Sequence, residues 1–234
     1  MTAARALREL TAPVEDYLKA IYELEAVRGV AETNEIAATL RIAAPSVSGM
    51  LRRLSRQRLV THEPYKGVHL TPEGRRAALR TIRRHRVIES YLTHALGYPW
   101  DRVHDEAERM EHSASDELID RMARAIGHPE TDPHGAPIPT REGTLTAEPA
   151  LQSLADLGQD VPARIARVGD RDGERLRYLA TMGITIGTQV EVVSREPYDG
   201  PIAIRIGSRR RMIGPELARH ILVAPIGKRH PRRG

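Results

Sequence analysis

The chain has 234 residues, a formal net charge of +5 and no cysteine. This length allows one large domain or two to three small ones. Without cysteine, disulfides, thiolate sites and iron–sulfur clusters are excluded, and any metal must be bound by oxygen and nitrogen. No stretch approaches the roughly 20 apolar residues that cross a bilayer, and no signal peptide opens the chain, so we expect a cytoplasmic protein with no membrane partner. The positive charge favours a polyanionic partner such as nucleic acid.

Residues 1–74 are predicted to form a winged helix-turn-helix domain. Apolar side chains recur at helical spacing in three segments, each opened by a proline or threonine of the kind found at helix starts: 13–28, 33–41 and 45–57. Two short strands, 59–61 and 68–70, enclose a polar turn, which is typical of a β-hairpin. Three helices followed by a hairpin is the order of a winged helix, which places one helix in the major groove of DNA.

Residues 75–140 are predicted to form a helical domain, built on the long helix that begins near Thr71 and runs to about Leu96. A second helix is expected over 101–126. Residues 128–150 are rich in proline, glycine and threonine and show no period, so we interpret them as unstructured connection, with the linker proper at 141–160.

The last part, residues 161–227, is predicted to be a small β-barrel. Four segments alternate or are rich in branched apolar residues and are separated by glycine- and proline-containing turns: 161–168, 189–193, 202–206 and 221–223. A short helix is expected around 173–182. The predicted fold class is therefore mainly α with small β parts.

The third predicted helix carries the features of a DNA-recognition helix. No acidic residue lies between Ile36 and Glu63, and the span contains five arginines: Arg41, Arg52, Arg53, Arg56 and Arg58. Ser46 and Ser48 lie in the first turn, from which side chains reach bases and phosphates. Gly49 costs about 1 kcal/mol in a helix interior, which close approach to DNA explains. Similar motifs also occur as protein-interaction modules, but charge, helix order and hairpin together favour DNA.

A second pattern consists of carboxylates and imidazoles at helix-turn spacing. His104, Glu108, Glu111 and His112 stand at i, i+4, i+7 and i+8, where a helix normally buries apolar residues. His85 and Glu89 are aligned at i and i+4 on the preceding helix. The alternative for any one of these residues is a surface ion pair. The whole set, which Asp16 on the first helix extends, favours a metal site.

Four segments of the chain resemble the diphtheria toxin repressor / manganese transport regulator family of metal-dependent transcription factors: EDYLKAIYELE (15–25), APSVSGMLRRLSRQRLV (44–60), LTPEGRRAALRTIRRHRVIESYL (70–92) and VHDEAERMEHSASDELIDRM (103–122). The C-terminal segments 179–193 and 196–207 resemble the SH3-like domain, related to ferrous-transport A proteins, of the longer members. The resemblance implies a winged-helix domain, a helical metal-binding and dimerisation domain, and an SH3-like domain.

The resemblance also implies site residues. The primary metal site falls on Asp16, Glu108, Glu111 and His112, and the ancillary site on His85, Glu89 and His104. DNA contacts fall on Pro45, Ser46, Ser48, Gly49, Arg53, Arg56 and Lys66, with Thr33 and Asn34 near the DNA backbone. The SH3-like domain of longer members lends ligands to the ancillary site; here Arg175 replaces one donor, which leaves Asp172 or Glu174 for that role.

The donor set distinguishes two branches of the family. Iron-type members have methionine and cysteine where this chain has Asp16 and Glu108, whereas manganese-type members share these carboxylates. Manganese-type members also carry a glutamate where this chain has Lys19, which argues against their closely spaced two-metal cluster. We expect a homodimeric repressor of metal uptake genes that binds a palindromic operator and two metal ions per subunit, Mn²⁺ or alternatively Fe²⁺.

Two further interpretations remain. A helical di-metal enzyme also uses such side chains, but its Glu-x-x-His pairs are absent from the sequence. A metal-independent DNA-binding protein would hold the same carboxylates in ion pairs. We expect a DNA-binding regulator and no enzymatic activity.

Overall fold

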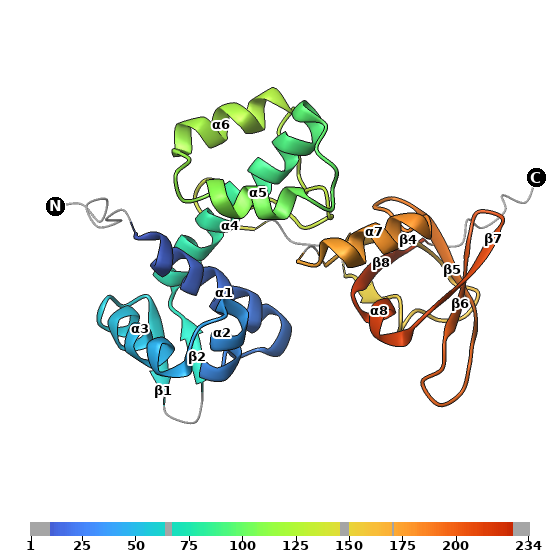
Figure 1. Ribbon diagram of the computed structural model, residues 1–234, viewed down its shortest axis with the longest axis horizontal. Helices are drawn as coiled ribbons and strands as arrows, with labels where there is room; N and C mark the ends of the chain where they lie inside the picture. The colour runs from blue at the N-terminus through green and yellow to red at the C-terminus, as the bar shows by residue number, and fades with distance from the viewer. Residues whose placement is uncertain (1–9, 64–66, 146–149, 170, 227–234) are drawn as a thin grey trace, which may run out of the picture. The chain divides into compact units, whose positions relative to one another are not determined.

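The computed structural model describes residues 10–63, 67–145, 150–169 and 171–226 (Figure 1). The chain divides into two compact units: Met1–His85 with Glu108–Asp120 and Ile138–Thr146, and Arg86–Ala107 with Arg121–Pro137 and Ala147–Gly234. No helix in the described part of the chain is long and apolar enough to cross a bilayer. The expected domain boundaries stay a prediction.

The first unit begins with the predicted winged helix. Its elements follow in chain order (Figure 1): α1 (Ala12–Arg28), α2 (Thr33–Leu40), α3 (Ala44–Arg56), β1 (Val60–Glu63) and β2 (Gly67–Leu70). The two strands are antiparallel, with Val60 opposite Leu70, and Val68 forms a further bridge to Ala31. Buried aliphatic side chains of α1, α2 and α3, among them Ile21, Ile36 and Leu51, form one core, so the three helices are held together.

Local signals explain where these helices begin and end. Gly29, with φ of +79°, ends α1 in the left-handed conformation that glycine adopts without strain. Thr33 is not the N-cap of α2, as the sequence suggested. Glu32 occupies that position, and its backbone N–H donates to the Glu35 carboxylate, 3.4 Å away.

The long helix α4 (Pro72–Leu96) is confirmed, but the single helix expected over 101–126 is wrong. The chain forms α5 (Val103–Met110) and α6 (Asp116–Ala125), with a turn between them. The backbone N–H groups of Ser113 and Ala114 both donate to the Met110 carbonyl. The Ser115 hydroxyl then accepts from the Leu118 N–H, 3.2 Å away, and starts α6 as an N-cap does.

The C-terminal part of the second unit is an antiparallel sheet with two short helices. Its elements are β3 (Gln152–Ser153), β4 (Pro162–Val168), α7 (Gly173–Thr181), β5 (Gln189–Arg195), β6 (Ile202–Ile206), β7 (Arg209–Ile213), α8 (Pro215–Arg219) and β8 (Ile221–Pro225). The strands pair in the order β3-β8-β4-β5-β6-β7. The predicted strands and α7 are confirmed, whereas β3, β7 and α8 were not foreseen. Ile165, Val192 and Ile204 lie in the buried core of this part.

The segment expected to be unstructured makes specific contacts within the second unit. The Asp132 carboxylate accepts hydrogen bonds from the backbone N–H groups of His134 (2.8 Å) and Ala136 (2.9 Å). The His134 carbonyl accepts from the Val168 N–H of β4. Leu154 and Leu157, inside the expected linker, are fully buried in the C-terminal core. Lack of a hydrophobic period therefore did not mean lack of structure here.

Candidate metal centre

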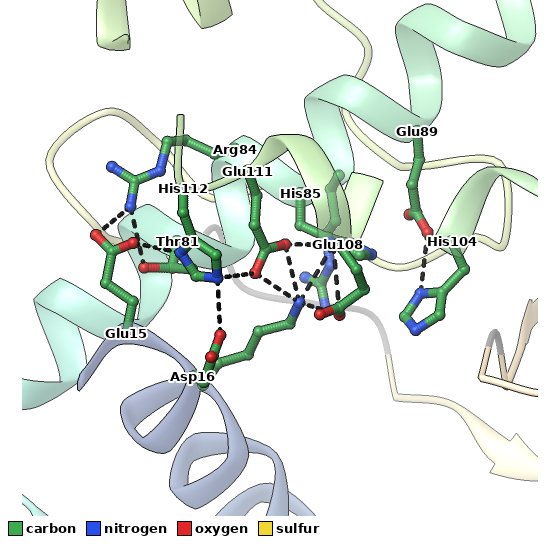
Figure 2. Close-up of polar contacts among 12 residues, drawn as sticks. Glu15, Asp16, Thr81, Arg84, His85, Glu89, His104, Glu108, Glu111 and His112 are labelled. Carbon is green, nitrogen blue, oxygen red and sulfur yellow. Dashed lines mark hydrogen bonds and ion pairs between the residues drawn. The ribbon is translucent and has the colours of Figure 1, made fainter. Parts of the chain in front are cut away.

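Three of the predicted primary-site residues lie together in the first unit. Ligand atoms of Asp16, Glu111 and His112 all lie within 4.8 Å of one another. His112 Nε2 is 2.8 Å from Asp16 Oδ1 and 3.6 Å from Glu111 Oε1, and Figure 2 shows the ring joined to these side chains. Asp16 comes from α1, whereas Glu111 and His112 come from the turn after α5. The group therefore joins the winged helix to a later part of the chain.

The turn after α5 explains how Glu111 and His112 reach this position. Because α5 ends at Met110, the two residues do not continue the helical stripe on which the sequence placed them. Glu111 is 0% exposed. A second carboxylate of α1, Glu15, accepts from His112 Nδ1 at 2.7 Å and also pairs with Arg84 of α4 (Figure 2).

Two carboxylates control the charge of His112. The hydrogen bond to Asp16, and next that to Glu15, raise the pKa of His112 from its ordinary 6.5 to about 10. Burial acts in the opposite direction and is outweighed. In the metal-free protein the imidazole is therefore a cation at neutral pH, and a metal ion that uses its Nε2 must displace a proton.

The remaining predicted primary ligand, Glu108, lies beside a residue that sequence reasoning did not place in the site. Lys19 Nζ is 2.6 Å from Glu108 Oε1 and 3.0 Å from Glu111 Oε2. It is also 3.2 Å from His85 Nδ1, which itself lies 2.5 Å from Glu111 Oε2. His85, assigned by the resemblance to the ancillary site, thus shares Glu111 with the primary set. Residue spacing alone could not reveal Lys19, because its contacts come from distant segments.

A second group of ligand-type side chains lies in the second unit. Glu89 Oε1 is 3.4 Å from His104 Nδ1, as the ancillary assignment expects (Figure 2), and Glu89 Oε2 is 3.8 Å from His134 Nδ1. Glu89, Asp132 and His134 are all buried, and each offers a ligand atom within 4.8 Å of the others. His134 stacks on Trp100 at 5.9 Å between ring centroids. The sequence signal for the two added residues is the short Asp132-Pro133-His134 run, which we had interpreted as linker.

Asp172 and Glu174 have other surroundings. The Asp172 carboxylate accepts from the Arg175 N–H at 3.0 Å and so caps α7, and this backbone hydrogen bond lowers the pKa of Asp172. The Glu174 side chain is 91% exposed. Among the described residues, neither side chain joins a group of three ligand-type residues. Their role as ligands stays a prediction.

The predicted DNA-contacting residues lie on the outer side of α2 and α3. Val47, Leu51 and Leu54 face the core, which leaves Pro45, Ser46, Arg53 and Arg56 exposed. Thr33 and Asn34 open α2, with Asn34 exposed, and Ser48 is partly exposed and bonds back to the Ala44 carbonyl. A Cβ built on Gly49 meets nothing within 4 Å, so the helix itself does not require a glycine there. Lys66 lies outside the described residues.

The donor chemistry fits a hard divalent cation. Asp16, Glu111 and His112 offer only oxygen and nitrogen, and they converge from separate segments. The completely buried Glu111 carboxylate needs positive charge or hydrogen-bond donors close to it. Glu89, Asp132 and His134 meet the same criteria in the second unit. These groups can hold metal ions without any sulfur ligand.

Three regions of the chain match known families. Residues 9–68 match the iron-dependent repressor N-terminal DNA-binding domain, residues 71–140 the iron-dependent repressor metal-binding and dimerisation domain, and residues 152–225 the FeoA domain. A winged helix, a helical domain with converging ligand-type side chains and a small β domain thus define a metal-responsive DNA-binding protein.

Individual relatives agree with this class. The chain is 33% identical over 200 residues to a diphtheria toxin repressor of Corynebacterium glutamicum, a match that covers 81% of this chain and 87% of the relative. It is 35% identical over 133 residues to the iron-dependent repressor IdeR of Mycobacterium tuberculosis, over 57% of this chain and 58% of the relative. A solved manganese-dependent transcriptional repressor in complex with manganese superposes with a TM-score of 0.83 and 36% identity, over 91% of this chain and 100% of that chain. The chain belongs to the diphtheria toxin repressor family of metal-dependent transcriptional repressors.

The raised pKa of His112 predicts how the metal-free protein responds to pH. Because the folded-state pKa is above the ordinary 6.5, the ion pairs of His112 contribute stability that is complete below pH 6.5 and is lost as the pH rises through about 10. His112→Gln should therefore lower the free energy of unfolding more near neutral pH than above about pH 10. Denaturant titrations with a chelator present measure this difference.

His94→Gln is the control, because His94 is an exposed histidine of α4 outside this group. Equal destabilisation by His112→Gln at both pH values would contradict the assigned ion pairs.

Proposed function

We propose that this chain is a homodimeric repressor of metal uptake genes that binds a palindromic operator when Mn²⁺ is bound, with Fe²⁺ as the alternative activator. The observation that carries the proposal is the convergence of Asp16 with Glu111 and His112. Asp16 belongs to α1, which shares its core with the proposed recognition helix α3. A ligand held by both segments acts directly on the DNA-binding part of the chain.

The proposed mechanism is thermodynamic linkage. A bound cation favours the conformations in which its ligands are close together and disfavours those in which they separate. Asp16 positions α1, and Glu111, His112 and Glu108 provide the other side. In a dimer, a fixed orientation of each winged helix places the two recognition helices at the spacing of successive major grooves, about 34 Å. DNA binding and metal binding then strengthen each other by the same factor.

The ancillary role is assigned to the remaining ligand-type residues. His85 extends the set around Glu111, and Glu89 with His104 forms the predicted ancillary pair. Asp132 and His134 add donors beside Glu89. Asp172 or Glu174 is retained as the contribution of the C-terminal domain. We propose two metal ions per subunit on this basis.

The choice of Mn²⁺ rests on the donors. Carboxylates and imidazoles suit Mn²⁺, and no sulfur ligand is available to favour softer or later metals. Affinity alone increases from Mn²⁺ to Fe²⁺ and beyond, so selectivity must come from coordination geometry and from metal levels in the cell. A similar structure contains manganese, whereas two relatives are iron-dependent or diphtheria toxin repressors.

We also propose that the chain has no enzymatic activity. The family consists of DNA-binding repressors, and the exposed arginines of α3 have a purpose only in the DNA-binding interpretation. A metal-independent DNA-binding protein is the other alternative. Equilibrium dialysis with Mn²⁺ distinguishes it, because such a protein would retain no metal.

Chelation should abolish specific DNA binding. The measurement is a mobility shift on a duplex selected from random sequences by the Mn²⁺-loaded protein, with Mn²⁺ and with chelator. We expect a shift only with metal, and Asp16→Ala should remove the response to Mn²⁺ because it separates α1 from the other ligands. Equal affinity with and without metal would refute the proposed activation.

Loss of phosphate contacts should change the salt dependence of binding. Arg53→Ala and Arg56→Ala should each weaken binding to specific and nonspecific duplexes alike and reduce the slope of log K against log salt by about 0.9. Arg210→Ala, an exposed arginine on β7, is the matched control and should leave the slope unchanged. If the α3 variants keep the wild-type slope, these residues do not contact phosphate.

Exchange of two donors should change the metal preference. Asp16→Met with Glu108→Cys restores the sulfur donors of iron-type relatives and should shift activation of DNA binding from Mn²⁺ towards Fe²⁺ or Co²⁺. Titrations of each metal against the selected duplex measure the order of effectiveness. A variant that keeps the wild-type order would show that these two residues do not set selectivity.

A further inference from the structure

An ammonium group lies inside the predicted ligand set. Lys19 is 7% exposed, and its Nζ lies 2.6 Å from Glu108 Oε1, 3.1 Å and 3.0 Å from the two oxygens of Glu111, and 3.2 Å from His85 Nδ1. Every one of these partners is a residue to which we assign a metal-binding role. The buried cation is therefore in contact with the ligands themselves.

The type of residue at this position is unusual for the chain. Of its 36 lysines and arginines, only three are lysines: Lys19, Lys66 and Lys228. Arginine presents a flat, wide fork, whereas lysine ends in a compact charge with three donors. A compact cation surrounded by two carboxylates and an imidazole has the coordination partners that a metal ion would have.

A metal ion and this ammonium group require the same lone pairs. The Glu111 carboxylate is completely buried, so it cannot turn towards water when its partner changes. Two cations that share it also repel each other strongly, because the surroundings screen poorly. By contrast, Asp16 and His112 meet Glu111 from the α1 side through His112 Nε2, which lies 3.6 Å from Glu111 Oε1.

We propose that Lys19 is an internal cation that competes with the divalent metal for Glu108 and Glu111. In the metal-free protein it neutralises these carboxylates and keeps α1 joined to the turn after α5. When metal binds, the ammonium group must give up at least one of these oxygens. Lys19 thereby sets the metal concentration at which the site fills. This inference rests on the proposed function, since it assumes that the ligand set binds metal.

The test is Mn²⁺ binding by the full-length protein and its Lys19→Met variant, measured by isothermal titration calorimetry. Methionine keeps most of the length of the side chain and removes its charge. We expect Lys19→Met to bind Mn²⁺ about tenfold or more tightly than the wild type, because the competing cation is gone. Its metal-free form should unfold at a lower temperature, and Mn²⁺ should raise its melting temperature more than that of the wild type.

Arg80→Met is the matched control. It removes a cation from the same unit, but Arg80 pairs with Asp116, 2.6 Å away, to which we assign no metal-binding role. It should change Mn²⁺ affinity by less than about threefold. A Lys19→Met variant that binds Mn²⁺ no more tightly than this control would overturn the competition.

The two proposals fail in different ways. If the wild type binds Mn²⁺ and Lys19→Met binds it no more tightly, only the role of Lys19 is wrong. If the wild type binds none and Lys19→Met does, the competition is supported and the proposed Mn²⁺ response is wrong. If neither binds, both are overturned.

A measurement on the wild type covers the case in which Lys19→Met does not fold. Lysine labelled with ¹³C at Cε gives three signals, one for each lysine of the chain. Titration with Zn²⁺, a diamagnetic ion, should move the Lys19 signal, identified with Lys19→Arg, and leave those of Lys66 and Lys228 in place. A Lys19 signal that stays unchanged as Zn²⁺ saturates the protein would overturn the proposal.

Discussion

The buried carboxylate of Glu111 is the constraint on which the first unit depends. A carboxylate removed from water must be matched by positive charge or hydrogen-bond donors. Here Lys19 of α1, His85 of α4 and His112 of the following turn surround it. Because α1 shares its core with α2 and α3, a change of charge around Glu111 acts on the element that carries the DNA-binding helices. Charge neutralisation in the centre and the placement of the winged helix are thus one energetic problem.

Much of the fold could be predicted because its signals are local. Helical spacing and helix-start residues identified α1, α2, α3 and α4, and alternating apolar residues identified the strands β4, β5, β6 and β8. The break after Met110 was missed because ligand-type residues continue at helical spacing up to His112, while the N-cap at Ser115 carries no pattern of its own. Strand β7 was missed because its run of three arginines hides the alternation.

The site was only partly predictable for a different reason. Asp16, Glu111 and His112 stand out by residue type, and the structure brings them together. The contacts of Lys19 with Glu108 and Glu111 span about 90 positions of sequence, so spacing carries no information about them. Asp132 and His134 lie in a segment without period, where an Asp132 carboxylate bound to backbone N–H groups, rather than apolar burial, creates the structure.

The central claim is that a metal held by Asp16, Glu111 and His112 is coupled to DNA binding. Linkage requires that metal tightens DNA binding and DNA tightens metal binding by the same factor. The direct measurement is the Mn²⁺ dissociation constant of the full-length protein with and without a saturating selected duplex. The account predicts tighter Mn²⁺ binding on DNA, by the factor that Mn²⁺ exerts on DNA affinity, and loss of this coupling in Asp16→Ala. A Mn²⁺ dissociation constant that is the same with and without the duplex would contradict it.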